Sequence, residues 1–168
     1  MALRNIVTVG DDVLNKTCRP VTKFDEKLGQ LIDDMIETMQ QANGVGLAAP
    51  QVGILRRVVV VDAGEEVFEL VNPEIIEVGE ETQTGLEGCL SVPGQYGIVT
   101  RPNFVVVRAQ DRTGEWYEVE GEELIARAFC HELDHLDGHI YTEIAERMLT
   151  EEELQKLEEE YDEDEEEA

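Results

Sequence analysis

The chain has 168 residues, of which 42% are hydrophobic, so its length suits a single domain and its composition excludes disorder throughout. Its 39 acidic and 13 basic residues give a formal charge of −26, and a field of that sign repels the phosphate backbone of nucleic acids. The longest apolar run, Val58 to Val61, is far too short to span a bilayer, and the first residues lack the apolar stretch of a secretory signal. We therefore expect a monomeric, cytoplasmic protein that binds neither a membrane nor, through its acidic surface, nucleic acid.

The first predicted element is a helix over residues 25–42. Its apolar residues recur at helical spacing and form one stripe, which indicates core packing; they are Leu28, Leu31, Ile32, Met35, Ile36 and Met39. Asn43 and Gly44 follow, and asparagine or glycine just past the last turn is a typical stop signal.

Strands are expected in the middle of the chain, where short apolar or alternating segments rich in β-branched residues recur. They cover residues 57–62, 67–71, 75–78, 104–109 and 116–119. Turns are expected at Asn72-Pro73, at Pro93-Gly94 and over residues 111–114, so the last two strands should form a hairpin. A second helix is expected over residues 122–137 and should end at Gly138.

The end of the chain has a different composition, because residues 151–168 contain 12 acids and one lysine. Thr150 and Glu153 form a capping-box pattern, which predicts a solvated helix from Glu151 to about Tyr161. Residues 162–168 should fray. A charge run of this kind is usually a solubilising feature and needs no partner.

The segment His131-Glu132-Leu133-Asp134-His135 lies within the second predicted helix and indicates a metal site. Residues four apart share one face of a helix, so His131 and His135 can bind the same ion. Glu132 projects about 100° further around the axis, where it can hydrogen-bond a water on that ion without being a ligand. This spacing indicates a metal-dependent amide hydrolase, the alternative being two helix histidines paired with ordinary neighbours.

Two imidazoles are too few for a catalytic ion, which usually has three protein ligands and a water. Downstream candidates are His139, which lies beyond the expected helix end, and one of the many glutamates of the tail. Upstream, Cys89 follows Gly88, whose missing side chain lets the backbone approach an ion, and a thiolate is a strong ligand for zinc or iron. The three cysteines are an odd number and argue against a disulfide framework. The residues alone leave the third ligand open.

Residues 44–51 read Gly-Val-Gly-Leu-Ala-Ala-Pro-Gln, a loop whose small residues leave its amides open to an extended ligand. Gln51 adds a side-chain donor. The paired glycines lack the third glycine and the preceding strand of a dinucleotide-binding fingerprint. The loop therefore predicts contact with an extended substrate.

Taken in order, three segments resemble those of the peptide deformylase family. They are GxGLAAxQ at Gly44–Gln51, EGCLS at Glu87–Ser91 and HExDHLxG at His131–Gly138. Three co-occurring motifs are far more specific than one. The resemblance implies an α+β fold in which antiparallel sheets wrap around the central helix that carries HExxH, with the N-terminal helix packed outside. It also implies one catalytic domain over residues 1–150, followed by an acidic helix or tail over residues 151–168.

The resemblance further implies one divalent ion, Fe(II) in the cell, with zinc, nickel or cobalt able to occupy the same site. Its ligands would be Cys89, His131 and His135. The reaction would remove the formyl group from the N-terminal methionine of newly synthesised polypeptides and release formate. Metal-bound hydroxide would attack the formyl carbon, with Glu132 acting first as general base and then as general acid. The Gln51 amide and the backbone N–H of Leu90 would stabilise the oxyanion.

The substrate would be an N-formylmethionyl peptide or nascent chain that binds near Val45 and Gly46 as if adding a strand. The methionine side chain needs an apolar pocket. By family position and helix spacing, the residues expected to bind substrate are Gly44, Val45, Gly46, Gly88, Leu124 and Ala128, with His131 at the pocket wall.

Several departures from the family pattern, and one expected ion pair, carry further expectations. Cys130 stands where many members have glutamine, and we expect a buried thiol there and no ligand. Arg127 stands where an apolar pocket residue is expected, so it either turns outward or makes the pocket entrance more polar. Glu87 and Arg101 are expected to pair and orient the cysteine loop, with an ordinary surface pair as the alternative. Family members act on chains emerging from the ribosome, but ribosomal RNA would repel the acidic tail of this chain.

Three other functions remain open at this point. A metalloprotease with HExxH and a distant glutamate would keep its metal without Cys89. A structural or oxidation-sensing site would be closed by four protein ligands and would not need Glu132. A related enzyme could act on another acylated amine.

Overall fold

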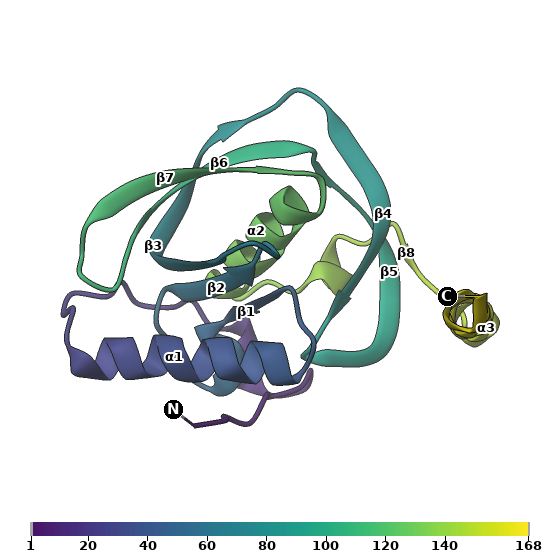
Figure 1. The fold of residues 1–168 in the computed structure, drawn as a ribbon, viewed down its shortest axis with the longest axis horizontal. Coiled ribbons are helices and arrows are strands. Elements are labelled where there is room, and N and C mark those ends of the chain that lie inside the picture. The colour runs from purple at the N-terminus through teal and green to yellow at the C-terminus, as the bar shows by residue number, and fades with distance from the viewer. Residues whose placement is uncertain (1, 168) are drawn as a thin grey trace.

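The computed structural model describes residues 2–167 as an α+β fold in which two antiparallel sheets surround a central helix (Figure 1). The α-helices are α1 (Glu26–Gln41), α2 (Glu123–Leu136) and α3 (Glu151–Glu167). Short 3-10 turns lie at Asp12–Asn15, Ala49–Val52 and Tyr141–Glu143. The expected fold class is confirmed.

The larger sheet has the strand order β1-β2-β3-β6-β7 and is antiparallel throughout. Its strands are β1 (Gly46–Ala48), β2 (Val58–Asp62), β3 (Val67–Val78), β6 (Phe104–Gln110) and β7 (Trp116–Glu122). Successive side chains of a strand point to opposite faces. In β2, Val59 and Val61 pack in the core cluster of α2, whereas Val58 and Val60 pack with α1. Both faces of β2 are therefore covered, which explains its unbroken apolar run.

The smaller sheet has the order β4-β5-β8 and was missed by the sequence analysis. Its strands are β4 (Thr82–Cys89), β5 (Val92–Pro102) and β8 (Arg147–Met148). Strands β4 and β5 form one long hairpin whose turn lies at Leu90 and Ser91. The turn expected at Pro93-Gly94 is therefore wrong, because these two residues lie inside β5.

The turn expected at Asn72-Pro73 is also wrong. Strand β3 continues through both residues and absorbs them as an irregularity in its pairing with β6. Asn72 adopts a positive φ of 51°, and its side chain accepts from the N–H of Val21 at 2.7 Å and donates to the Val21 carbonyl at 2.9 Å. These bonds hold the loop before α1 against the strand, so the pair forms a bulge instead of a chain reversal.

Helix α1 lies outside the larger sheet (Figure 1). The carboxylate of Asp25 accepts from the N–H of Leu28 at 3.1 Å and caps its first turn. The predicted apolar stripe faces the core, with five of its members buried and Ile36 partly buried. The prediction of this helix is confirmed to within a residue at each end.

Helix α2 crosses the interior between the sheets, so residues 126–133 are all buried. It ends at Leu136, and the chain turns at Gly138, which has a φ of 81°. A Cβ at this glycine would lie 2.7 Å from the backbone of Asn15, so only glycine fits both the turn and the close approach. The predicted range of 122–137 is correct to within a residue at each end.

Helix α3 stands apart from the body of the protein (Figure 1). Its start is capped as predicted, because the N–H of Thr150 donates to Glu153 and the N–H of Glu153 donates to the Thr150 hydroxyl. It continues to Glu167 and so is longer than the helix expected to end near Tyr161. Of the segment expected to fray, Ala168 lies outside the described residues. Within the described residues, none of the helices is both long enough and apolar enough to span a membrane.

Candidate metal centre

Helix α2 brings His131 and His135 to one face, as their spacing requires. Their rings meet edge to face with centroids 5.0 Å apart, and both side chains are buried. The hairpin of β4 and β5 brings Cys89 to the same point, where its Sγ lies 3.3 Å from Nε2 of His135. Each of these three residues offers one potential ligand atom, and the three atoms lie within 4.8 Å of one another. A single ion could be held between them.

The alternative third ligands lie elsewhere. His139 is exposed, its Nδ1 lies 3.1 Å from Glu143, and it is not part of the cluster of Cys89, His131 and His135. Tyr141, which is no candidate ligand, is buried and stacks on the ring of His131 with centroids 5.8 Å apart. Among the side chains described, no glutamate of α3 joins the cluster of Cys89, His131 and His135.

The turn at Ala49–Val52 positions the amide of Gln51 beside the cysteine. Its Oε1 accepts from the N–H of Ala48 at 2.9 Å, which fixes the orientation of the amide. Its Nε2 then donates to the hydroxyl of Ser91 at 3.1 Å and lies 3.5 Å from the Sγ of Cys89. The side chain is buried, so a rigid N–H donor stands next to the thiol of Cys89.

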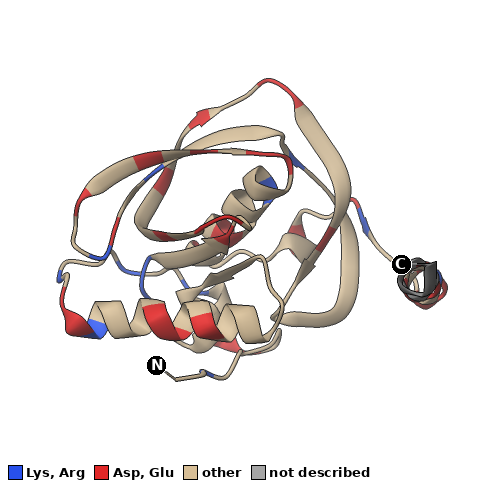
Figure 2. Ribbon diagram, viewed as in Figure 1, with Lys and Arg blue, Asp and Glu red and all other residues tan. Residues whose placement is uncertain are grey.

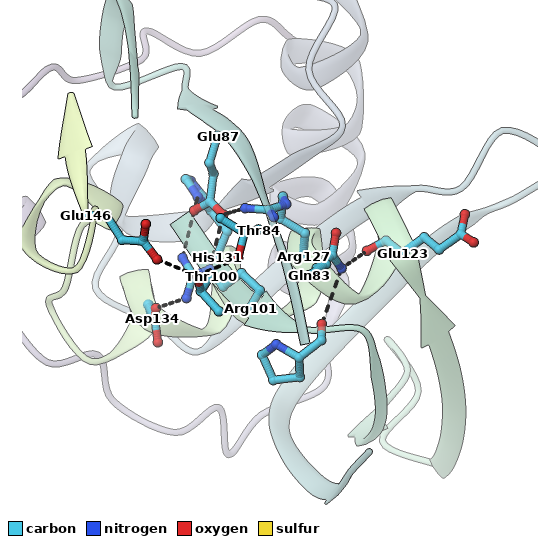
Figure 3. Close-up of polar contacts among 11 residues, drawn as sticks. Gln83, Thr84, Glu87, Thr100, Arg101, Glu123, Arg127, His131, Asp134 and Glu146 are labelled. Carbon is cyan, nitrogen blue, oxygen red and sulfur yellow. Dashed lines mark hydrogen bonds and ion pairs between the residues drawn. The ribbon is translucent and has the colours of Figure 1, made fainter. Parts of the chain in front are cut away.

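A buried carboxylate, Glu87, supports the centre from behind (Figure 3). Its Oε2 lies 2.7 Å from Nδ1 of His131 and accepts from Arg101 at 2.7 Å, while Oε1 accepts from Arg101 at 3.1 Å and from Arg127 at 2.9 Å. Arg101 reaches on to Asp134 at 2.7 Å. Burial alone would raise the pKa of Glu87, but the bonds from His131 and Arg101 outweigh it and lower that pKa to about 2. The pairing expected of Glu87 and Arg101 is confirmed.

The two histidines have opposite electrostatic surroundings. Burial would lower the pKa of His131, but the neighbouring carboxylates of Glu132 and Glu87 and the Cys89 thiol outweigh burial and raise that pKa well above its usual value. At His135, burial and the positive charge of His131 lower the pKa to about 3. The centre thus favours positive charge on the side of His131 and a neutral imidazole at His135.

Glu132 is buried beside the ligands, and burial raises its pKa to about 7. Its Oε1 has no hydrogen-bond partner among the described residues. Gly46 packs directly against this carboxylate, since a Cβ at Gly46 would lie 2.6 Å from Oε2. A carboxyl group in this state can take up or release a proton near neutral pH.

A cavity of about 390 Å³ opens above these residues. Its lining includes Gln51, Leu90 and Glu132 as well as every residue expected to bind substrate, namely Gly44, Val45, Gly46, Gly88, Leu124 and Ala128. Val45 and Leu124 are exposed, so an apolar rim surrounds its mouth. That these residues contact substrate stays a prediction.

Arg127 turns inward. Its guanidinium reaches Glu87, its side chain is buried, and it contributes to the cavity lining, so of the two orientations left open the outward one is wrong. Cys130 is buried, as expected, and burial raises the pKa of its thiol to about 11. The sequence analysis did not identify Ser91, Tyr96 or Tyr141 as neighbours of the centre. Ser91 ends the EGCLS segment but was given no role there, whereas Tyr96 and Tyr141 lie outside the three motifs and carry no spacing signal.

Known proteins resemble this chain over most of its length. The sequence profile described as polypeptide deformylase matches residues 3–151. The chain belongs to the polypeptide deformylase family. It is 62% identical over 149 residues to the peptide deformylase of Agathobacter rectalis, a match that covers 89% of this chain and 94% of the relative. It is 54% identical over 156 residues to that of Caldicellulosiruptor bescii, covering 93% of each chain.

Solved structures of peptide deformylases share the fold. The crystal structure of the enzyme from Thermotoga maritima superposes with a TM-score of 0.83 at 45% identity, covering 85% of this chain and 97% of that one. A peptide deformylase from Synechococcus elongatus in complex with actinonin gives 0.81 at 37% identity, covering 91% and 82%. The chain is thus an enzyme of a family that is metal-dependent and removes N-formyl groups from polypeptides.

The residues present fit a metal ion. The three candidate ligand atoms converge, and Glu87 occupies Nδ1 of His131 so that its Nε2 remains for the ion. A thiolate and two imidazoles with room for a further ligand are compatible with iron or zinc. The cluster of Cys89, His131 and His135 could therefore bind the ion on which the family depends.

Proposed function

We propose that this protein removes the formyl group from the N-terminal methionine of newly synthesised polypeptides, as a monomer in the cytoplasm. In the balanced reaction, water adds across the formyl C–N bond, and the products are formate and a free amine. The observation that carries the proposal is the convergence of Cys89, His131 and His135 beside a buried, unpaired carboxylate at Glu132. Residues 1–150 would form the catalytic domain, and residues 151–168 a solubilising tail.

Cys89, His131 and His135 would hold one divalent ion, Fe(II) in the cell, with zinc, nickel or cobalt accepted in its place. When bound, such an ion lowers the pKa of water toward neutrality and polarises a carbonyl group. Glu87 would fix the His131 ring by accepting from its Nδ1 at 2.7 Å. The hairpin would therefore position a ligand of the helix as well as supply Cys89.

Glu132 would act as the proton carrier. Its pKa of about 7 lets the carboxylate accept a proton from the attacking water at neutral pH. The same carboxyl group would then give that proton to the departing amine. Gly46 supports this role, because the absence of a side chain there leaves room for the Glu132 carboxylate at the cavity floor.

Gln51 and the backbone N–H of Leu90 would stabilise the negative charge that develops on the formyl oxygen. The Gln51 amide suits this role because Ala48 and Ser91 hold its orientation before substrate arrives. We predict that Gln51→Ala lowers kcat by about 10²–10³ with the metal retained, as for other oxyanion donors. Steady-state kinetics with parallel metal analysis measures both, and an unchanged kcat would remove Gln51 from the mechanism.

The substrate peptide would pair with the backbone near Val45 and Gly46 as an added strand, since these residues border the edge strand β1. The methionine side chain would enter the apolar part of the cavity beside Leu124 and Ala128. Recognition through the backbone would leave the enzyme largely indifferent to residues after the methionine.

The decisive experiment is formate release from a formyl-methionyl peptide by protein purified without oxygen and loaded with Fe(II) or Ni(II). We expect turnover by both forms and a ratio of about one ion per chain. A formylated peptide that begins with lysine should be a poor substrate, because the pocket is apolar at its mouth. Absence of turnover by both metal forms would contradict the proposal.

A further inference from the structure

The basic residues of this acidic protein are divided into two groups. Of the 13 lysines and arginines, seven form ion pairs with carboxylates, namely Arg4, Arg57, Arg101, Arg108, Arg112, Arg127 and Arg147. Lys156 lies in α3. The other five make no ion pair among the described side chains, and they are Lys16, Arg19, Lys23, Lys27 and Arg56. All five side chains are exposed.

These five residues lie together. One pocket, of about 320 Å³, is lined by Lys23, Lys27 and Arg56, and a second, of about 780 Å³, by Lys16, Arg19 and Arg56. The pockets adjoin, since both are lined by Ile54 and Arg56. We call the surface formed by these five residues the basic face. In Figure 2 several blue segments lie near the start of α1, together with red ones, at the side of the molecule away from α3.

Two of the arginines lie side by side, and neither forms an ion pair with a carboxylate among the described side chains. Arg19 and Arg56 form a parallel β-bridge, so their backbones lie about 4.8 Å apart. The bridge is held by bonds from the N–H of Arg19 to the Leu55 carbonyl at 3.1 Å and from the N–H of Arg57 to the Arg19 carbonyl at 3.0 Å. Like charges placed side by side are destabilising. In a chain with 39 acids, two adjacent arginines that form no ion pair among the described side chains give a local excess of positive charge.

The nearby acids are engaged otherwise. The carboxylate of Asp25, which lines the first pocket, accepts from the N–H of Leu28 as the cap of α1. Asp34 neutralises Arg4 through contacts of 3.0 Å. Asp25 keeps its negative charge, but it is the only carboxylate among the residues that line the two pockets, so the basic face keeps a net positive charge.

We propose that the basic face is a docking surface for the phosphate backbone of RNA. Guanidinium and ammonium groups grouped in concave pockets suit phosphates, and such contacts do not depend on base sequence. A lipid bilayer fits less well, because the apolar residues Leu28 and Leu31 at the base of the first pocket are buried and cannot insert. The charge distribution does not depend on the proposed function. The choice of RNA does depend on it, because new polypeptides are made by the ribosome, which is rich in RNA.

The position of the basic face leaves the metal centre accessible. Lys27 lies in the first turn of α1, whereas Gly44, at the mouth of the cavity, follows its last turn. The 16 residues of α1 separate them by about 24 Å at 1.5 Å per residue. RNA on the basic face would therefore not cover the cavity, and α3 would lie at the opposite side of the molecule (Figure 1).

The test is fluorescence anisotropy with a labelled single-stranded RNA at salt concentrations from about 50 to 200 mM, where phosphate contacts change affinity most visibly. The full-length protein should bind, with a logarithmic salt slope of up to about −3.5 for five contacts. Lys23→Glu should weaken binding several-fold and reduce the slope by about 0.7. Lys156→Glu is the matched control, because the same change in α3 alters the total charge equally and should leave affinity within about twofold.

Three outcomes would overturn the proposal. The protein might show no binding at low salt, Lys156→Glu might weaken binding as much as Lys23→Glu, or vesicles of phosphatidylcholine and phosphatidylserine might bind more tightly than RNA. Formate release is measured on the same samples. Because Lys23 touches no part of the metal centre, Lys23→Glu should keep the wild-type rate, so a failure of RNA docking is distinguishable from a failure of the proposed reaction.

Discussion

Helix α2 and the β4–β5 hairpin contribute to the metal centre in different ways. The helix carries His131, Glu132 and His135, whose mutual geometry follows from local hydrogen bonds and a fixed rise per residue. The hairpin carries Cys89 and Glu87, whose positions depend on pairing along the whole length of two strands and on an irregularity between residues 87 and 89. Sequence spacing therefore describes the helical half of the centre well and the hairpin half poorly.

The two histidines show what the hairpin adds to the helix. They are the same residue type on the same face, yet Nδ1 of His131 is held by Glu87, whereas Nδ1 of His135 is buried without a partner in the described part of the chain. The pKa of His131 is raised and that of His135 is lowered. Part of the difference comes from the hairpin, which carries Glu87 and Cys89, and part comes from Glu132 on the helix itself.

The largest effect is expected at the hairpin ligand. Cys89→Ala should abolish stoichiometric metal binding and reduce formate release below detection, because two imidazoles do not hold a catalytic ion. Metal content and formate release measure the two effects. Cys130→Ala is the matched control, since it removes a buried thiol one residue before His131 that is no candidate ligand, and it should keep the metal. Retained metal with endopeptidase activity in Cys89→Ala would favour a metalloprotease.

Glu132→Gln should affect the rate without affecting the ion. Removing a general acid–base group costs about 10²–10⁴ in kcat. The metal should stay, because Glu132 is not among the clustered ligand atoms. Kinetics and metal analysis on one preparation separate the two properties. A loss of metal equal to that of Cys89→Ala would mean that Glu132 is a ligand, whereas an unchanged rate would favour a structural or sensing site.

The sequence predicts helix α2 better than the β4–β5 hairpin, because a helix depends on local periodicity and the hairpin does not. Helix α2, helix α1 and the β6–β7 hairpin follow from local periodicity, and their ends agree with the predicted ranges to within about one to three residues. Strands β4 and β5 contain Gly85, Gly88, Gly94 and Gly97, which dilute the β-branched pattern on which strand prediction depends. The pairing of β5 with β8, which joins Gly97 to Met148, leaves no local signal.

The candidate site was predictable in part. The paired histidines and Glu132 follow from spacing alone, but counting left the third ligand open among Cys89, His139 and a distant glutamate. The family resemblance selected Cys89 and Gln51. The inward orientation of Arg127 could not be predicted, because it depends on the position of Glu87 at the end of a strand that the sequence analysis missed.

A smaller effect is expected at the carboxylate behind His131. Glu87→Gln should weaken metal binding by about 10–100-fold, the usual cost of removing a partner that orients a metal-bound histidine. The affinity is measured by competition with a chelator, and circular dichroism checks the fold, since Arg101 and Arg127 lose a shared anion. Glu143→Gln is the matched control, because Glu143 contacts His139 at 3.1 Å on the exposed surface, where removing the charge should leave metal affinity unchanged. Equal affinities in the two variants would mean that the hairpin supplies only Cys89.

The smallest effect is expected at Asp134, the residue of helix α2 that pairs with Arg101. Asp134 accepts from Arg101 at 2.7 Å, but its side chain is 38% exposed, so water screens the pair. Asp134→Asn should lower the free energy of unfolding by about 0.2–1 kcal/mol and change metal affinity by no more than about threefold. Arg101 would still hold Glu87 through its other two N–H groups, at 3.1 and 2.7 Å. Asp137→Asn, which breaks an exposed pair with Arg57 at the end of the same helix, should have a similar effect on stability. If Asp134→Asn instead weakened metal binding tenfold while Asp137→Asn did not, Asp134 would help to orient His131 through Arg101 and Glu87, and the helix and the hairpin would depend on each other.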